Sequence, residues 1–134
     1  MLSVFDLFKI GIGPSSSHTM GPMLAGRSFA GELAALGLLG AVARLQVDLF
    51  GSLALTGRGH GTDAAVLAGL ELEDPEHVDP ARLPARAAAL RQGADLMLAG
   101  VQAVPFVYGR DLLEHKGLFL PRHANALTLT ALTA

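Results

Sequence analysis

Two segments far apart in the chain alternate between apolar and polar residues. Within residues 44–50, leucine or valine at 45, 47 and 49 alternates with arginine, glutamine and aspartate at 44, 46 and 48. Within residues 126–131, leucines and alanine alternate with threonines. A period of two is typical of a β-strand with one buried face and one solvent-facing side. Both segments are therefore predicted to be half-buried strands.

The segments around these strands favour helices and turns. Pro22 suits the first turn of a helix over residues 20–39, where the missing N–H of proline is no loss. The side-chain oxygen of Thr62 or Asp63 is suited to cap a second helix that runs to Leu70. The other expected elements are a short helical turn at 3–8, a surface connection at 75–84, a helix at 85–92, and strands at 96–101 and 105–108. This mixture of helices and antiparallel strands predicts an α+β fold with a mixed or antiparallel sheet packed against helices.

Length and composition limit the kinds of protein that this can be. The chain has 134 residues, of which 51% are hydrophobic and 16% charged, so we expect one folded domain over residues 1–134 rather than a disordered chain. A formal net charge of −2 does not fit binding to a nucleic acid backbone. The longest uncharged apolar stretch, residues 33–43, is too short to span a membrane, and the first residues do not resemble a secretory signal. A cytoplasmic protein is expected.

The first segment that could carry chemistry spans residues 11–22. Ser15, Ser16, Ser17 and His18 lie directly before the predicted first helix. Hydroxyls, backbone amides and the positive end of a helix dipole are suited to bind a carboxylate or a phosphate. The alternative is that Ser17 or Thr19 only caps the helix.

The second segment, residues 57–63, has glycines on both sides of His60. Glycines let the backbone approach a ligand and leave the imidazole accessible, and a neutral imidazole is the usual general base. The spacing matches neither the dinucleotide-binding fingerprint nor the P-loop. The alternative interpretation is a turn with a solvent-exposed histidine.

The third segment contains His123 and Asn125, which would share a face in extended backbone and could each bond a ligand. Asn125 could instead be a turn residue. The histidines do not have the spacing of a metal site, and the chain has no cysteine, so no metal site is expected within it. We assign no role to His77 or His115.

Taken together, the three segments resemble a known family. SVFDLFKIGIGPSSSHTMGPM at residues 3–23 is similar to the opening of the β chain, or β domain, of the iron–sulfur L-serine dehydratases. GSLALTGRGHGTD at 51–63 and LPRHAN at 120–125 are similar to that family's second and third signatures, in the same order. The resemblance implies a lyase that converts L-serine to pyruvate and ammonia. It also implies a four-iron four-sulfur cluster carried by the cysteines of a partner α chain, which agrees with the absence of cysteine here.

The resemblance also implies roles for individual residues. Ser15, Ser16 and Ser17 would hold the substrate carboxylate, and Thr62, His123 and Asn125 would complete the substrate-binding set. His60 is the preferred base, and His18 would orient the substrate or share in proton transfer.

Two other functions stay open at this point. Similar domains serve as allosteric substrate-binding modules in some bacterial 3-phosphoglycerate dehydrogenases, where the domain binds an anion and performs no chemistry. The chain could also be a structural partner that shields the cluster of its α chain. Homodimerisation is a further expectation.

Overall fold

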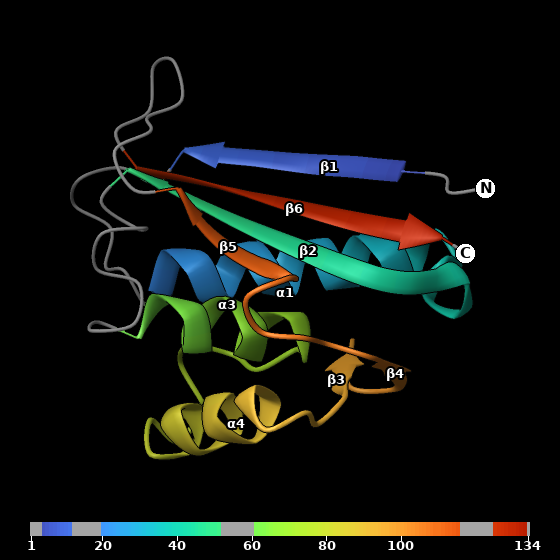
Figure 1. Ribbon diagram of the computed structural model, residues 1–134. Coiled ribbons are helices and arrows are strands. Elements are labelled where there is room, and N and C mark those ends of the chain that lie inside the picture. Colours follow the sequence, from blue (N-terminus) through green and yellow to red (C-terminus); the bar gives the residue numbers. More distant parts are fainter. Residues whose placement is uncertain (1–3, 12–19, 52–60, 116–124, 134) are drawn as a thin grey trace.

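The computed structural model describes residues 4–11, 20–51, 61–115 and 125–133. Helices and strands are intermixed along the chain, which confirms the α+β prediction (Figure 1). The elements are β1 (Val4–Gly11), α1 (Met20–Ala35), the 3-10 helix η1 (Leu39–Ala41), β2 (Val42–Gly51), α3 (Thr62–Leu70), α4 (Arg82–Arg91), β3 (Leu96–Leu98), β4 (Gln102–Val104), β5 (Leu112–His115) and β6 (Asn125–Thr133).

The main sheet has four strands in the order β1-β6-β2-β5. β6 is antiparallel to both of its neighbours, β1 and β2, whereas β5 runs parallel to β2. The sheet is therefore mixed, one of the two arrangements expected. A short antiparallel pair, β3 and β4, forms a separate two-stranded sheet.

The two alternating segments are strands, as predicted. In β2, Leu45, Val47 and Leu49 are fully buried, and in β6 Leu127 and Leu129 are buried in the same cluster. These side chains pack against α1 and α3, so one face of the sheet is covered by helices. The intervening polar residues of β2 lie on the opposite face.

β1 corrects the helical turn expected at residues 3–8. The segment is an extended strand that pairs along β6, from Val4 opposite Leu132 to Gly11 opposite Ala126. Its sequence, VFDLFKIG, is rich in the branched and aromatic residues that strands favour. Its partner, β6, lies at the other end of the chain, so the local sequence around β1 does not predict the pairing.

α1 ends earlier than residue 39. Gly37 adopts the left-handed conformation with φ of 72°, and the Leu38 N–H donates to the Leu33 carbonyl while the Gly37 N–H donates to that of Ala34. These two bonds form a Schellman motif, in which glycine at this position stops the helix. The chain then turns through η1 into β2.

α3 is the central helix of the fold, because every residue from Thr62 to Leu70 is buried. It crosses α1 at two glycines. A methyl group on Gly26 would overlap the Val66 carbonyl oxygen, and one on Gly69 would overlap that of Met23. The absence of side chains here lets the two backbones touch.

The segment after α3 differs from expectation in three places. α4 begins at Arg82 rather than 85, with Pro84 in its first turn, where proline is tolerated. The strand expected at 96–101 stops at Leu98, because Gly100 turns the chain with φ of 74°. The strand expected at 105–108 is wrong: β4 precedes Pro105, which cannot donate a hydrogen bond, and the next strand is β5.

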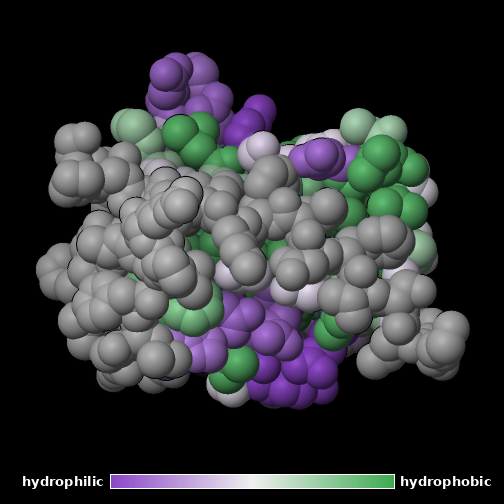
Figure 2. Space-filling model, turned by 90° about the horizontal axis from the view of Figure 1, so that it is seen from above, coloured by the Kyte–Doolittle hydropathy of each residue, from purple (hydrophilic) through white to green (hydrophobic). Residues whose placement is uncertain are grey.

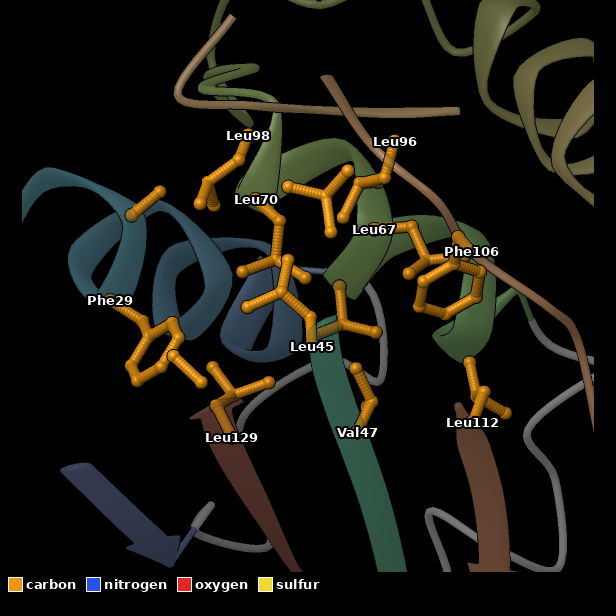
Figure 3. Close-up of a cluster of buried hydrophobic side chains, with 14 of the residues drawn as sticks. Phe29, Leu45, Val47, Leu67, Leu70, Leu96, Leu98, Phe106, Leu112 and Leu129 are labelled. Atoms are coloured by element: carbon orange, nitrogen blue, oxygen red, sulfur yellow. The ribbon is translucent and has the colours of Figure 1, made fainter. Parts of the chain in front are cut away.

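One core joins the sheet, α1, α3 and the β3–β4 pair. Phe29, Leu67, Leu96 and Phe106 meet the side chains of β2 and β6 there (Figure 3). Seen from above, the described surface mixes hydrophilic and hydrophobic areas (Figure 2). Among the described residues, no helix has the length and apolarity needed to cross a membrane.

Candidate active site

Several strand ends meet at one end of the sheet. Gly11, the last residue of β1, pairs with Ala126, and Gly51, the last of β2, pairs with Asn125. His115, the last residue of β5, is level with Phe50. β1, β2 and β5 therefore finish where β6 begins.

The helices α1 and α3 begin at this same end, as their blue and green starting turns in Figure 1 show. Met20 starts α1, and Thr62 starts α3. Residues 12–19 and 52–60 thus connect strand ends to helix starts at this end, and residues 116–124 connect β5 to β6. We call the end of the sheet marked by Gly11, Gly51, His115 and Asn125 the strand-exit edge.

Most of the predicted site residues belong to these connections. Ser15, Ser16, Ser17, His18, His60 and His123 lie outside the described residues. The backbone of Asn125 is described and pairs with Gly51, but its side chain is not. Among the predicted site residues, Thr62 is therefore the one with a described side chain.

Thr62 is not the cap of α3, nor is Asp63. The cap position belongs to Gly61, which adopts the left-handed conformation with φ of 76°, and no side chain caps this helix start. Thr62 is instead the first helical residue, with 0% of its surface exposed. Its hydroxyl oxygen Oγ1 is buried, with no hydrogen-bond partner in the described structure. Burying a hydroxyl without a hydrogen bond destabilises the folded chain, and native proteins rarely do so. The unpaired Oγ1 therefore makes Thr62 a candidate for binding a ligand.

Asp63 has structural partners that the sequence does not reveal. Its carboxylate Oδ2 accepts hydrogen bonds from Arg91 Nη2 at 2.9 Å and from the Tyr108 hydroxyl at 3.1 Å. The Arg91 guanidinium also lies 5.1 Å from the centre of the Tyr108 ring. Asp63 is a negative charge in the first turn of α3, where the helix dipole favours it. Its role is to tie α3 to α4 and to residue 108.

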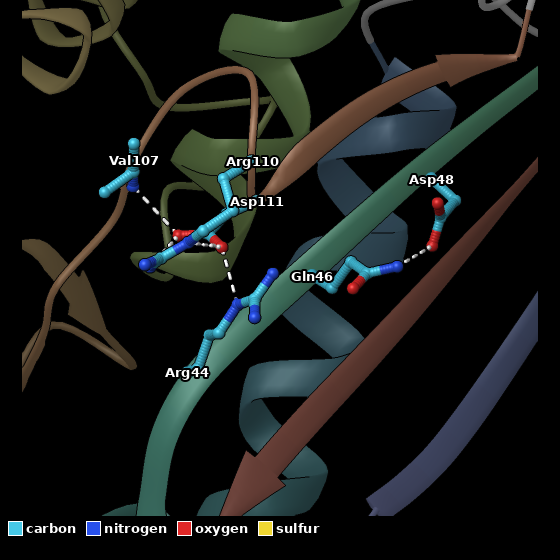
Figure 4. A network of polar contacts seen from close by, with 6 residues as sticks. All are labelled: Arg44, Gln46, Asp48, Val107, Arg110 and Asp111. Atoms are coloured by element: carbon cyan, nitrogen blue, oxygen red, sulfur yellow. Dashed lines mark hydrogen bonds and ion pairs between the residues drawn. The ribbon is translucent and has the colours of Figure 1, made fainter.

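A histidine–carboxylate pair lies at the strand-exit edge. His115 Nε2 is 2.8 Å from Asp48 Oδ1, and the imidazole stacks on the Phe50 ring with centroids 4.5 Å apart. Asp48 Oδ2 accepts a bond of 3.1 Å from Gln46 Nε2 (Figure 4). No role was expected for His115 from the sequence. The alternation at 44–50 puts Asp48 on the polar face, but no sequence signal places residue 115 beside it.

The other end of β5 is held by Asp111, whose side chain is fully buried. It accepts bonds from Arg44 Nε at 2.7 Å, Arg110 Nε at 2.8 Å and the Val107 N–H at 2.8 Å (Figure 4). Burial would raise the pKa of Asp111, but the bonds from Arg110, Val107 and Arg44 together outweigh burial and hold it below the ordinary value. This charged group anchors β5 away from the strand-exit edge.

The described residues contain no group of three or more His, Asp or Glu that could hold a metal ion. The sequence contains no cysteine at all, so it cannot supply the thiolates that hold iron–sulfur clusters.

Comparison with known proteins identifies the family. Residues 3–134 match the family described as serine dehydratase beta chain. The chain belongs to this family.

The relatives that the chain matches are longer proteins. The chain is 48% identical over 133 residues to the L-serine dehydratase of Streptomyces coelicolor, covering 99% of this chain and 29% of the relative. It is 45% identical over 132 residues to L-serine dehydratase 1 of Escherichia coli K12, and the match covers 98% of this chain and 29% of the relative. It is 47% identical over 130 residues to the L-serine dehydratase of Mycobacterium tuberculosis, and the match covers 97% of this chain and 28% of the relative. The chain thus spans less than a third of the length of these relatives.

Proposed function

We propose that this chain is the β subunit of an iron–sulfur L-serine dehydratase that converts L-serine to pyruvate and ammonia in the cytoplasm. The active site would be shared with an α chain that carries a four-iron four-sulfur cluster. Support comes from the family and from the L-serine dehydratases that the chain resembles over almost its whole length.

The cluster does not fit the residues of this chain. Thiolate ligands are absent, because the sequence has no cysteine. We infer that the ligands lie outside these 134 residues, on the proposed α chain, and the roles proposed below involve this chain's own residues only.

The single observation that carries the proposal is the topology of the strand-exit edge. β1, β2 and β5 end there, and α1, α3 and β6 begin there. The connections 12–19, 52–60 and 116–124, which contain most of the predicted site residues, are therefore each joined at both ends to this part of the molecule. Residues far apart in sequence can then contribute to one site.

We propose that His60 removes the α-proton of L-serine. The β-hydroxyl then leaves, and the resulting enamine hydrolyses to pyruvate and ammonia. His18 would orient the substrate or share in proton transfer. Ser15, Ser16 and Ser17 would bind the carboxylate beside the start of α1, where backbone amides and the helix dipole favour an anion.

Thr62, His123 and Asn125 would complete the substrate-binding set. The buried Thr62 hydroxyl supports this proposal, because a substrate atom would give Oγ1 the partner that it lacks in the described structure. Asn125 begins β6 directly opposite Gly51, so its backbone lies at the strand-exit edge.

Replacement of His60 by alanine tests the proposed function. In the enzyme assembled with the α chain, His60→Ala should lower kcat by about 10²- to 10⁴-fold, the usual effect of losing an acid–base group. Assembly, measured by size-exclusion chromatography, should be unchanged. Normal turnover would exclude His60 as the base and favour a non-catalytic anion-binding module.

A further inference from the structure

We propose that Asp48 and His115 form a positioning pair that fixes the ends of β2 and β5 relative to each other. This inference rests on the proposed function, because the two strand ends lead into the segments that carry His60 and His123. His115 would act through its bond to Asp48 and not on the substrate.

The geometry of the pair defines the bonding at three of its four polar atoms. An ionised carboxylate only accepts hydrogen bonds, so His115 Nε2 must carry the hydrogen that bonds Asp48 Oδ1 at 2.8 Å. Asp48 Oδ2 accepts from Gln46. The carboxylate therefore has a partner on each oxygen, and His115 Nε2 is fixed as a hydrogen-bond donor. The side chains are 11% and 29% exposed for Asp48 and His115, so water screens the bond only in part.

β5 depends on side-chain contacts such as the Asp48–His115 bond, because its backbone pairing is short. It is an edge strand whose neighbour in the described sheet is β2, and its register contains only four residue pairs, from Val47–Leu112 to Phe50–His115. Parallel pairing is also slightly less stable per residue than antiparallel pairing. Asp111 holds the start of β5, whereas the bond to Asp48 and the stacking on Phe50 hold its last residue.

A loss of this bond should therefore displace the strand-exit edge locally. Asp48 lies three residues before Gly51, and His115 is the final residue of β5. A displacement of about 1 Å in a catalytic constellation can cost on the order of 100-fold in rate. The expected signature is a lower kcat without a matching loss of folding.

The test compares two replacements of His115 in the enzyme assembled with its α chain. His115→Phe keeps a ring that can stack on Phe50 but removes the N–H donor, and kcat should fall by about 10- to 100-fold. His115→Gln keeps an N–H that can reach Asp48, and kcat should stay within about threefold of the unchanged enzyme. Equal impairment of both variants, or full activity of His115→Phe, would overturn the proposal.

Asp48→Ala provides an independent route to the same result. It should lower kcat at least as much as His115→Phe does, and the double variant should be no worse than Asp48→Ala, because both replacements remove the Asp48–His115 bond. Additive losses would contradict the pair. His77→Phe is the matched control: His77 also bonds a carboxylate, Asp74 Oδ2 at 3.0 Å, but it lies exposed between α3 and α4. Its kcat should not change.

A spectroscopic measurement separates this inference from the proposed function. In the chain without its partner, ¹⁵N NMR of the neutral His115 imidazole should show its hydrogen at Nε2 alone, and Asp48→Ala should place part of that hydrogen on Nδ1. A mixture of tautomers in the unchanged chain would overturn the pair. Failure of the unchanged assembled enzyme to form pyruvate would instead refute the proposed function, whatever the tautomer.

Discussion

At the scale of single residues, the Thr62 hydroxyl is expected to lower the stability of the fold and to bind the substrate. Its buried hydroxyl has no partner in the described structure, so Thr62→Val should leave the fold as stable or stabilise it by about 1 kcal/mol. If the hydroxyl binds L-serine, the same variant should raise KM by about 10-fold in the assembled enzyme. Thermal unfolding and steady-state kinetics measure the two effects.

Thr130→Val is the control for this variant, because Thr130 lies on β6 opposite Gln46, away from the strand-exit edge. It should not alter KM. A clearly less stable Thr62→Val chain would show that the hydroxyl has a structural role. An unchanged KM would show that it does not bind L-serine.

Asp111 gives a residue-scale prediction about acid stability. Since its pKa is lower in the folded chain than the ordinary 3.8, its charge stabilises the fold above about pH 4. That contribution is lost as the pH falls through the folded-state pKa. Asp111→Asn should cost about 2 kcal/mol at pH 7, because Arg44, Arg110 and the Val107 N–H lose a charged acceptor.

Urea unfolding at several pH values checks this prediction. The stability difference between the unchanged chain and Asp111→Asn should shrink below pH 4. Asp95→Asn, at an exposed position before β3, should change stability by less than about 0.5 kcal/mol. A constant difference across the pH range would contradict the assigned role of the Asp111 charge.

At the scale of elements, the crossing of α1 and α3 depends on two glycines. Gly69→Ala should destabilise the chain by about 3 kcal/mol or more, since the added methyl group overlaps the Met23 carbonyl of the facing helix. Gly31→Ala, in the exposed part of α1, meets no atom within 4 Å and should stabilise the chain by about 0.5–1 kcal/mol. Calorimetric melting measures both, and equal effects would show that the helices do not touch at Gly69.

The sequence could predict those helices and strands whose pattern lies within the segment itself. β2 and β6 carry their pattern locally, in alternating residues, and both predictions are confirmed. The helix that was expected to run to Leu70 is also present, but its cap is Gly61 and not Thr62 or Asp63. β1 and β5 depend on partners distant in the chain, and each is an edge strand of the sheet. Their pairing is decided by tertiary contacts. The local sequence therefore favours a helical turn for part of β1 and gives no signal for β5.

At the scale of the whole molecule, the topology brings the described ends of three connections, 12–19, 52–60 and 116–124, to one edge of the sheet. The sequence could identify these segments by resemblance, and the roles of His18, His60 and His123 remain predictions because they lie outside the described residues. The Asp48–His115 bond could not be foreseen, because it requires the parallel register of β2 and β5.

The most direct test of the proposed function is anaerobic complementation with L-serine. The chain should be colourless and inactive by itself, and the reconstituted α chain by itself should release no pyruvate above background. Their mixture should produce pyruvate and ammonia in equal amounts. Full pyruvate production by the α chain without this chain would contradict the shared active site.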